Sequence, residues 1–174
     1  MAYSIFELNQ MSQDTFTGVL GAIFEDTPTI AHQVWRDRPF ADLSDLHQRM
    51  VQIVQQMSPA AQLALITAHP DLGSKAKMAE ASVKEQAGAG LNQLTSEEYN
   101  RIQALNQAYK DKFGFPFITT VRTQTKASIF AAFDRRLQNT VEAETQQALA
   151  EIAQIARLRL LDLLENEEAS TSAP

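Results

Sequence analysis

Apolar residues recur at helical spacing along nearly the whole of this 174-residue chain. Phe16, Val19, Leu20, Ile23 and Phe24 follow the i, i+3, i+4, i+7, i+8 pattern of one helix face. Similar stripes recur nearer the carboxyl end, and no strand-like alternation of apolar and polar residues repeats. The pattern therefore predicts an all-α protein, with only residues 115–121 looking extended.

Residues that start and stop helices separate these stripes. Thr95, with Glu98 three residues later, has the spacing of a capping box. Gly114 is typical of a helix end, and Pro70 disfavours helical backbone at His69. The chain is long enough for one domain and short for two. We expect a single domain over residues 1–165 and a disordered C-terminal tail over residues 166–174.

Charge and composition exclude several classes of protein. The net charge of −6 comes without a basic cluster, which argues against nucleic acid or a membrane surface as partner. No apolar run approaches the ~20 residues that span a bilayer, and the N-terminus lacks the pattern of a signal peptide. The absence of cysteine excludes disulfides and Cys-based zinc sites. We expect a cytoplasmic protein.

Among the three histidines, His69 has the position most typical of a catalytic residue. It lies where a predicted helix ends and a proline redirects the chain, and such positions often carry catalytic side chains. A plain helix stop explains the position equally well. His32 and His47 lie in predicted helices among polar neighbours, which indicates surface residues. No two histidines have metal-ligand spacing, so no metal site is predicted.

A second candidate group is Ser82, Glu85 and Gln86, whose i, i+3, i+4 spacing places them on one helix face. An alternative is a capping box in which Ser82 is the cap and Glu85 the third residue of the helix. That alternative does not explain Gln86 or the glycine-rich exit that follows, where another segment can approach closely.

A third candidate is Arg159, which lies near the centre of the apolar stripe of the last helix, whereas Arg157 lies well outside it. A buried arginine is costly unless an anion meets it. That anion is either an internal carboxylate or the carboxylate of a ligand. The apolar face is broad, which also indicates contact on a second side, for example with another subunit.

The segment Phe113–Ile118, Phe-Gly-Phe-Pro-Phe-Ile, is the fourth candidate. Its composition alone favours a hydrophobic plug. An extended segment without a strand partner also offers backbone N–H and C=O groups, which can hold a flat ligand rich in amide groups.

Together these segments resemble the family of 2-oxo-4-hydroxy-4-carboxy-5-ureidoimidazoline (OHCU) decarboxylases. The resemblance covers nearly the whole chain and rests on these motifs in this order: His69-Pro70-Asp71-Leu72, Ser82-x-x-Glu85-Gln86, Ala89-Gly90-Leu91, Phe113–Ile118 and Ile155–Leu160. It implies an all-α fold of about eight helices, a homodimer, and catalysis without a metal or an organic cofactor.

The resemblance also implies roles for individual residues. His69 matches the catalytic histidine and Glu85 its acidic partner. The other matches are to residues that shape the pocket or contact the substrate: Pro70, Ser82, Gln86, Phe117, Ile118 and Arg159.

The implied reaction needs no cofactor, because the substrate carboxylate leaves a carbon beside an imine that accepts the electrons. We therefore expect a carboxy-lyase that converts OHCU to (S)-allantoin, the third step of urate breakdown in purine catabolism. Two alternatives remain open. A non-catalytic helical interaction module would have an exposed apolar groove, and its function would not depend on His69. A hydrolase of a ureido compound would release ammonia instead of CO₂.

Overall fold

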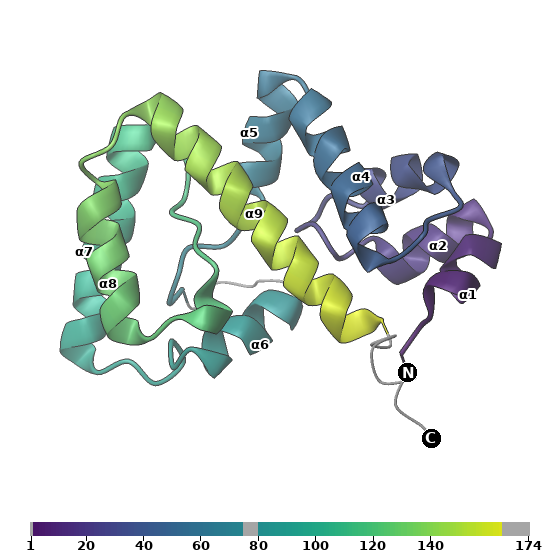
Figure 1. Cartoon of the computed structure of the whole chain (residues 1–174). Helices are drawn as coiled ribbons and strands as arrows, with labels where there is room; N and C mark the ends of the chain where they lie inside the picture. Colours follow the sequence, from purple (N-terminus) through teal and green to yellow (C-terminus); the bar gives the residue numbers. More distant parts are fainter. Residues whose placement is uncertain (1, 75–79, 165–174) are drawn as a thin grey trace. The chain divides into compact units, whose positions relative to one another are not determined.

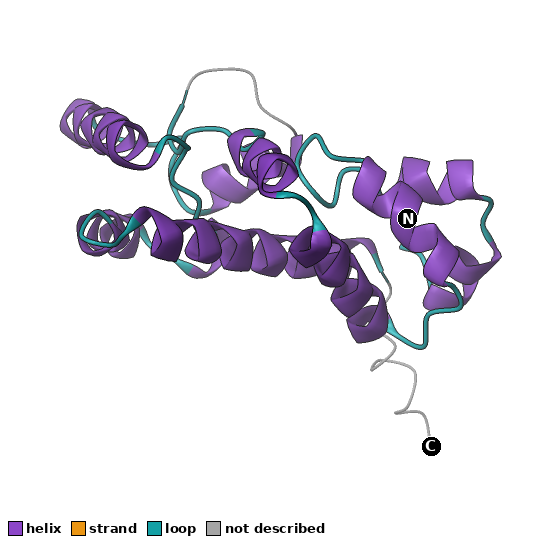
Figure 2. Ribbon diagram, turned by 90° about the horizontal axis from the view of Figure 1, so that it is seen from above, coloured by secondary structure: helices purple, strands orange, loops and turns teal. Residues whose placement is uncertain are grey.

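The computed structural model describes residues 2–74 and 80–164, which fold into α-helices, two short 3₁₀ helices and loops (Figure 2). The described residues form no strand; an isolated parallel bridge joins Tyr3 and Leu164. The prediction of an all-α fold is confirmed. The chain divides into two compact units, Met1–Pro59 with Ile155–Pro174, and Ala60–Gln154.

The first unit is built on three packed helices near the N-terminus. Helix α3 packs against both α2 and α4, and the apolar stripes of these helices are buried. Ser12 and Asp42 cap α2 and α4 by accepting from backbone N–H groups in the first turn. The elements are α1 (Ile5–Gln10), α2 (Gln13–Leu20), α3 (Thr29–Val34), η1 (Trp35–Asp37), α4 (Leu43–Gln56) and the C-terminal part of α9 (Val141–Leu163).

The second unit contains most of the predicted site. Helix α6 packs against η2, and α7 packs against α8, beside which it lies in Figure 1. The elements are nearly all of α5 (Pro59–Thr67), α6 (Glu80–Gly88), α7 (Ser96–Phe113), η2 (Val121–Thr123), α8 (Lys126–Arg136) and the first part of α9.

The predicted boundaries of α7 are confirmed. The Thr95 side chain accepts from the Glu98 N–H while the Glu98 carboxylate accepts from the Thr95 N–H, as a capping box requires. At the other end Gly114 has a φ of +80°, a left-handed conformation that costs little without a Cβ atom. This glycine turns the chain from α7 directly into the segment 115–121.

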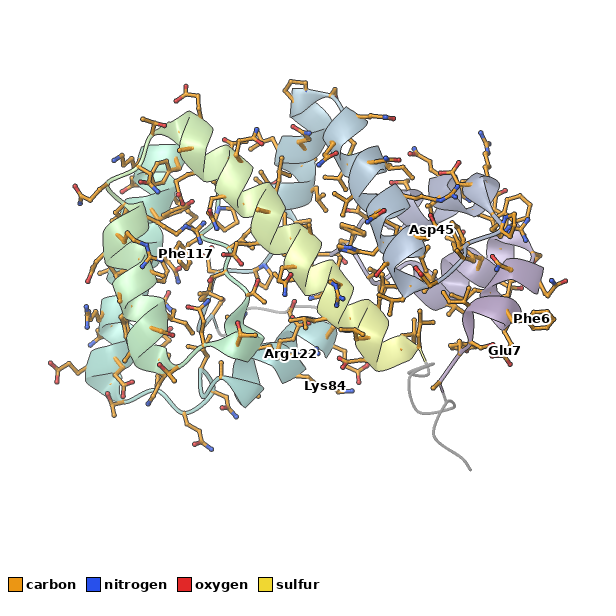
Figure 3. All side chains as sticks on the ribbon, in the orientation of Figure 1. Phe6, Glu7, Asp45, Lys84, Phe117 and Arg122 are labelled. Atoms are coloured by element: carbon orange, nitrogen blue, oxygen red, sulfur yellow. The ribbon has the colours of Figure 1, made fainter. Side chains whose placement is uncertain are left out.

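Aromatic rings form the centre of the second unit. Phe117 stacks on Phe133 with ring centroids 3.7 Å apart, and Tyr109 meets Phe117 edge to face at 5.2 Å. The hydrophobic-plug interpretation of the segment therefore holds for the Phe117 side chain, which is buried (Figure 3).

The predicted domain limit at residue 165 stays a prediction, and the predicted tail, residues 166–174, lies outside the described residues. Among the helices in the described part of the chain, none is long and apolar enough to cross a bilayer.

Candidate active site

His69 is buried, in the turn that follows α5. The backbone N–H of His69 donates to the Ile66 carbonyl, and its ring Nδ1 lies 2.9 Å from the Leu65 carbonyl oxygen. Because a carbonyl oxygen only accepts, Nδ1 carries the proton in this contact. In the neutral ring the lone pair is then on Nε2, which becomes the nitrogen able to accept a proton. His32 is exposed, as expected for a surface residue, whereas His47 is half-buried.

Three side chains hold the loop that follows His69. Lys110 Nζ contacts Asp71 Oδ2 at 2.7 Å, and Asn106 Nδ2 donates to the Leu72 carbonyl at 2.8 Å. From α6, Gln86 Oε1 accepts from the Gly73 N–H at 3.0 Å. These three contacts hold residues 71–73, the stretch directly after His69 and Pro70.

Helix α6 carries the second group of candidates. Ser82 and Gln86 are buried and Glu85 is half-buried. The capping alternative for Ser82 is wrong, because α6 already includes Glu80 and Ser82 lies inside the helix. Glu85 Oε1 lies 3.8 Å from an Nη atom of Arg122 in η2, the element that packs against α6; Figure 3 shows Arg122 beside α6.

Of the predicted extended segment, residues 115–120 form a loop, whereas Val121 begins η2. The backbone of this loop is partly engaged. The Ile118 carbonyl accepts from Arg136 at 2.6 Å, and the Thr120 N–H donates to Glu151 at 3.0 Å. Within the described residues, the N–H groups of Phe117, Ile118 and Thr119 make no hydrogen bond. Since buried N–H groups are rarely left without an acceptor, these three are candidates to face a ligand.

The second unit thus brings together three of the predicted segments. Gln86 ties α6 to the loop after His69 and Pro70, and α6 packs against η2, which follows Phe117 and Ile118. Arg159 belongs to the other unit.

Arg159 is buried and Arg157 half-exposed, so the predicted helical phase is confirmed. Arg159 Nη2 pairs with Glu25 Oε2 at 3.0 Å, and Nη1 reaches the Ala22 carbonyl at 3.4 Å. Both side chains of the ion pair are almost fully buried. An internal carboxylate, one of the two anions expected from the sequence, is therefore present.

Sequence reasoning missed Asn106, Lys110 and Arg122. For Asn106 a signal existed, because Ile102, Asn106 and Tyr109 are at i, i+4 and i+7 and all three are buried. A polar residue in the middle of an apolar stripe indicates a specific hydrogen-bond partner.

A pocket of about 460 Å³ lies in the second unit, beside the loop that follows His69, which is called the anchored loop below. It is lined by Gly73, Ser74, Leu91 and residues at the start of α7, including Tyr99. None of the eight predicted site residues lines it. In residues 2–74 and 80–164, no cluster of three or more His, Asp or Glu side chains could hold a metal ion.

Comparisons with known proteins identify what the chain is similar to. The profile of a family described as OHCU decarboxylase matches residues 9–161. A protein of Halalkalicoccus jeotgali named 2-oxo-4-hydroxy-4-carboxy-5-ureidoimidazoline decarboxylase is 39% identical over 160 residues, which is 92% of this chain and 91% of that protein.

Two further similarities are to longer proteins. The uric acid degradation bifunctional protein of Bacillus subtilis is 46% identical over 162 residues, 93% of this chain but only 33% of that protein. This chain therefore spans about a third of that relative's length. The crystal structure of an (S)-allantoin synthase superposes with a TM-score of 0.76 at 32% identity, covering 92% of this chain and 54% of the other.

Proposed function

The chain belongs to the OHCU decarboxylase family, and we propose that it is a carboxy-lyase that converts OHCU to (S)-allantoin, the third step of urate catabolism. The observation that carries the proposal is the buried His69, whose ring is oriented by the Leu65 carbonyl. The loop after His69 is fastened to α6 through Gln86, and α6 also carries Ser82 and Glu85.

His69 is the proposed proton-transfer group. Decarboxylation requires a proton to leave the substrate hydroxyl and a proton to reach one face of the adjacent carbon. An imidazole, with a reference pKa of about 6.5, exchanges protons readily near neutrality. The Nδ1 contact with Leu65 makes Nε2 the atom that accepts and returns the proton.

The other residues of the second unit bind and orient the substrate in this proposal. Glu85 holds the substrate's N–H groups, and Arg122 lies beside its carboxylate. Ser82 and Gln86 contribute hydrogen bonds; in Gln86 the carbonyl end already accepts from Gly73, so the amide NH₂ is the end that donates. Pro70 shapes the wall beside His69, and Phe117 and Ile118 contribute backbone and apolar contacts.

Arg159 is the proposed ligand of the substrate carboxylate. A guanidinium can make a planar two-point contact with a carboxylate. Arg159 Nη2 also pairs with Glu25 Oε2, which makes Arg159 a structural residue of the first unit as well.

Catalysis is expected to be independent of metal ions and organic cofactors, because the substrate's own imine accepts the electrons released with CO₂. Dialysis against a strong chelator should leave kcat unchanged in an assay of OHCU consumption. Loss of activity on chelation, with recovery on adding zinc or manganese, would contradict this expectation.

A homodimer is expected in solution, since the apolar face of α9 is broader than a single packed side requires. Light scattering at micromolar concentration should give twice the chain mass of 19.3 kDa. A monomer at that concentration would disprove the dimer. We further propose that the protein is cytoplasmic and that its partner is the small substrate, with neither nucleic acid nor a membrane.

The product tests the proposed function. Fresh OHCU, generated in the assay, should yield CO₂ and allantoin when the protein is added. Release of ammonia would identify a hydrolase of ureido compounds, and no acceleration at all would favour a non-catalytic helical interaction module.

A further inference from the structure

A buried ionic network in the second unit lies directly against the segment Phe117–Thr119. Glu144 is fully buried, and its carboxylate accepts from the Tyr109 hydroxyl at 2.6 Å, from Arg136 Nε at 2.7 Å and from Asn139 Nδ2 at 3.0 Å. Burial and the bond to Glu144 raise the pKa of the Tyr109 hydroxyl, so this group stays a donor.

Arg136 connects this network to the segment. Its Nη1 donates to the Ile118 carbonyl at 2.6 Å, and its guanidinium carbon lies 4.3 Å from the centre of the Phe117 ring. The side chain is only 4% exposed. Burying an ion pair contributes little net stability compared with apolar side chains of similar volume, so stability alone is a weak reason for its presence.

The bond from Arg136 fixes a whole peptide unit. A trans peptide is planar, and its C=O and N–H groups point in opposite directions. When Arg136 holds the Ile118 carbonyl, the N–H of Thr119 in the same unit points away from the network. That buried N–H makes no hydrogen bond within the described residues.

We propose that Arg136, held by Glu144, is a positioning residue that orients the Ile118–Thr119 peptide so that its N–H donates to the substrate. Arg136 does not touch the substrate. The inference rests on the proposed function, because it assumes that this segment contacts OHCU. It adds a residue from α8, outside every motif singled out in the sequence.

The test compares Arg136→Lys with Tyr109→Phe. Lysine keeps the charge, but its single ammonium group cannot bind Glu144 and the Ile118 carbonyl at the same time as the planar guanidinium does. Tyr109→Phe removes another hydrogen bond from Glu144 and leaves the contact with Ile118 intact. Arg136→Lys should raise KM for OHCU by about tenfold, the effect of one misplaced hydrogen bond. Tyr109→Phe should lower Tm by a similar amount to Arg136→Lys but leave KM unchanged.

If Arg136→Lys does not fold, Arg136→Met with Glu144→Met and Tyr109→Phe replaces the ion pair, and the hydroxyl that donates to Glu144, by apolar side chains and should restore folding. This triple variant also lacks the contact with Ile118, so its KM should be raised in the same way. A wild-type KM in either folded variant, or an equal rise in Tyr109→Phe, would overturn the inference. A wild-type protein that does not convert OHCU would instead overturn the proposed function.

Discussion

His69→Asn is expected to lower kcat for OHCU by about 10²- to 10⁴-fold, the usual contribution of a proton-transfer group. Asparagine can still donate to the Leu65 carbonyl but cannot accept and return a proton at neutral pH. The substitution should therefore leave the fold intact. Steady-state turnover and the thermal midpoint, measured on the same sample, separate the two effects.

His32→Asn and His47→Asn are the matched controls, because both histidines lie outside the anchored loop and His32 is exposed. Both should retain wild-type turnover. Near-normal turnover in a folded His69→Asn protein would remove His69 from the mechanism.

Arg159→Met should destabilise the protein by about 3–5 kcal/mol, because it leaves the buried Glu25 carboxylate without its cation. Chemical unfolding measures this loss. Arg157→Met is the control: its side chain is half-exposed, so stability and turnover should both stay close to wild type.

The loss of stability does not by itself reveal whether Arg159 binds substrate, so a double variant is needed. Arg159→Met with Glu25→Met removes both buried charges and should regain most of the stability. If Arg159 binds the substrate carboxylate, this variant stays inactive, and Arg159→Lys, which keeps the charge, is also impaired. Normal turnover per folded double variant would show that Arg159 serves only the ion pair with Glu25.

Local patterns predicted the fold well. The helical stripes and the signals at Thr95, Glu98 and Gly114 depend on neighbours within a few residues, and the structure confirms them. The burial of Arg159 followed from helical phase in the same way. For Ser82, a cap and a helix interior share the same i, i+3 spacing, and only the start of α6 before Ser82 distinguishes them.

Local sequence patterns could not predict which residues far apart in the sequence are partners. Arg159 pairs with Glu25, although most of the sequence separates the two residues, and no spacing rule selects that carboxylate from the others. Arg136 was missed although Ile129, Phe133 and Arg136 share one buried helix face, the same signal that identified Arg159. A charged residue in an apolar stripe indicates a buried partner, but the identity of that partner depends on the tertiary fold.

In the proposed reaction this chain decarboxylates OHCU and controls on which face the new proton arrives. The most direct measurement is chiral analysis of the allantoin formed from freshly generated OHCU, by circular dichroism, with and without the protein. We expect rapid formation of (S)-allantoin with the wild-type chain and slow formation of racemic allantoin with His69→Asn. Racemic allantoin formed at the uncatalysed rate in the presence of the folded wild-type protein would contradict it.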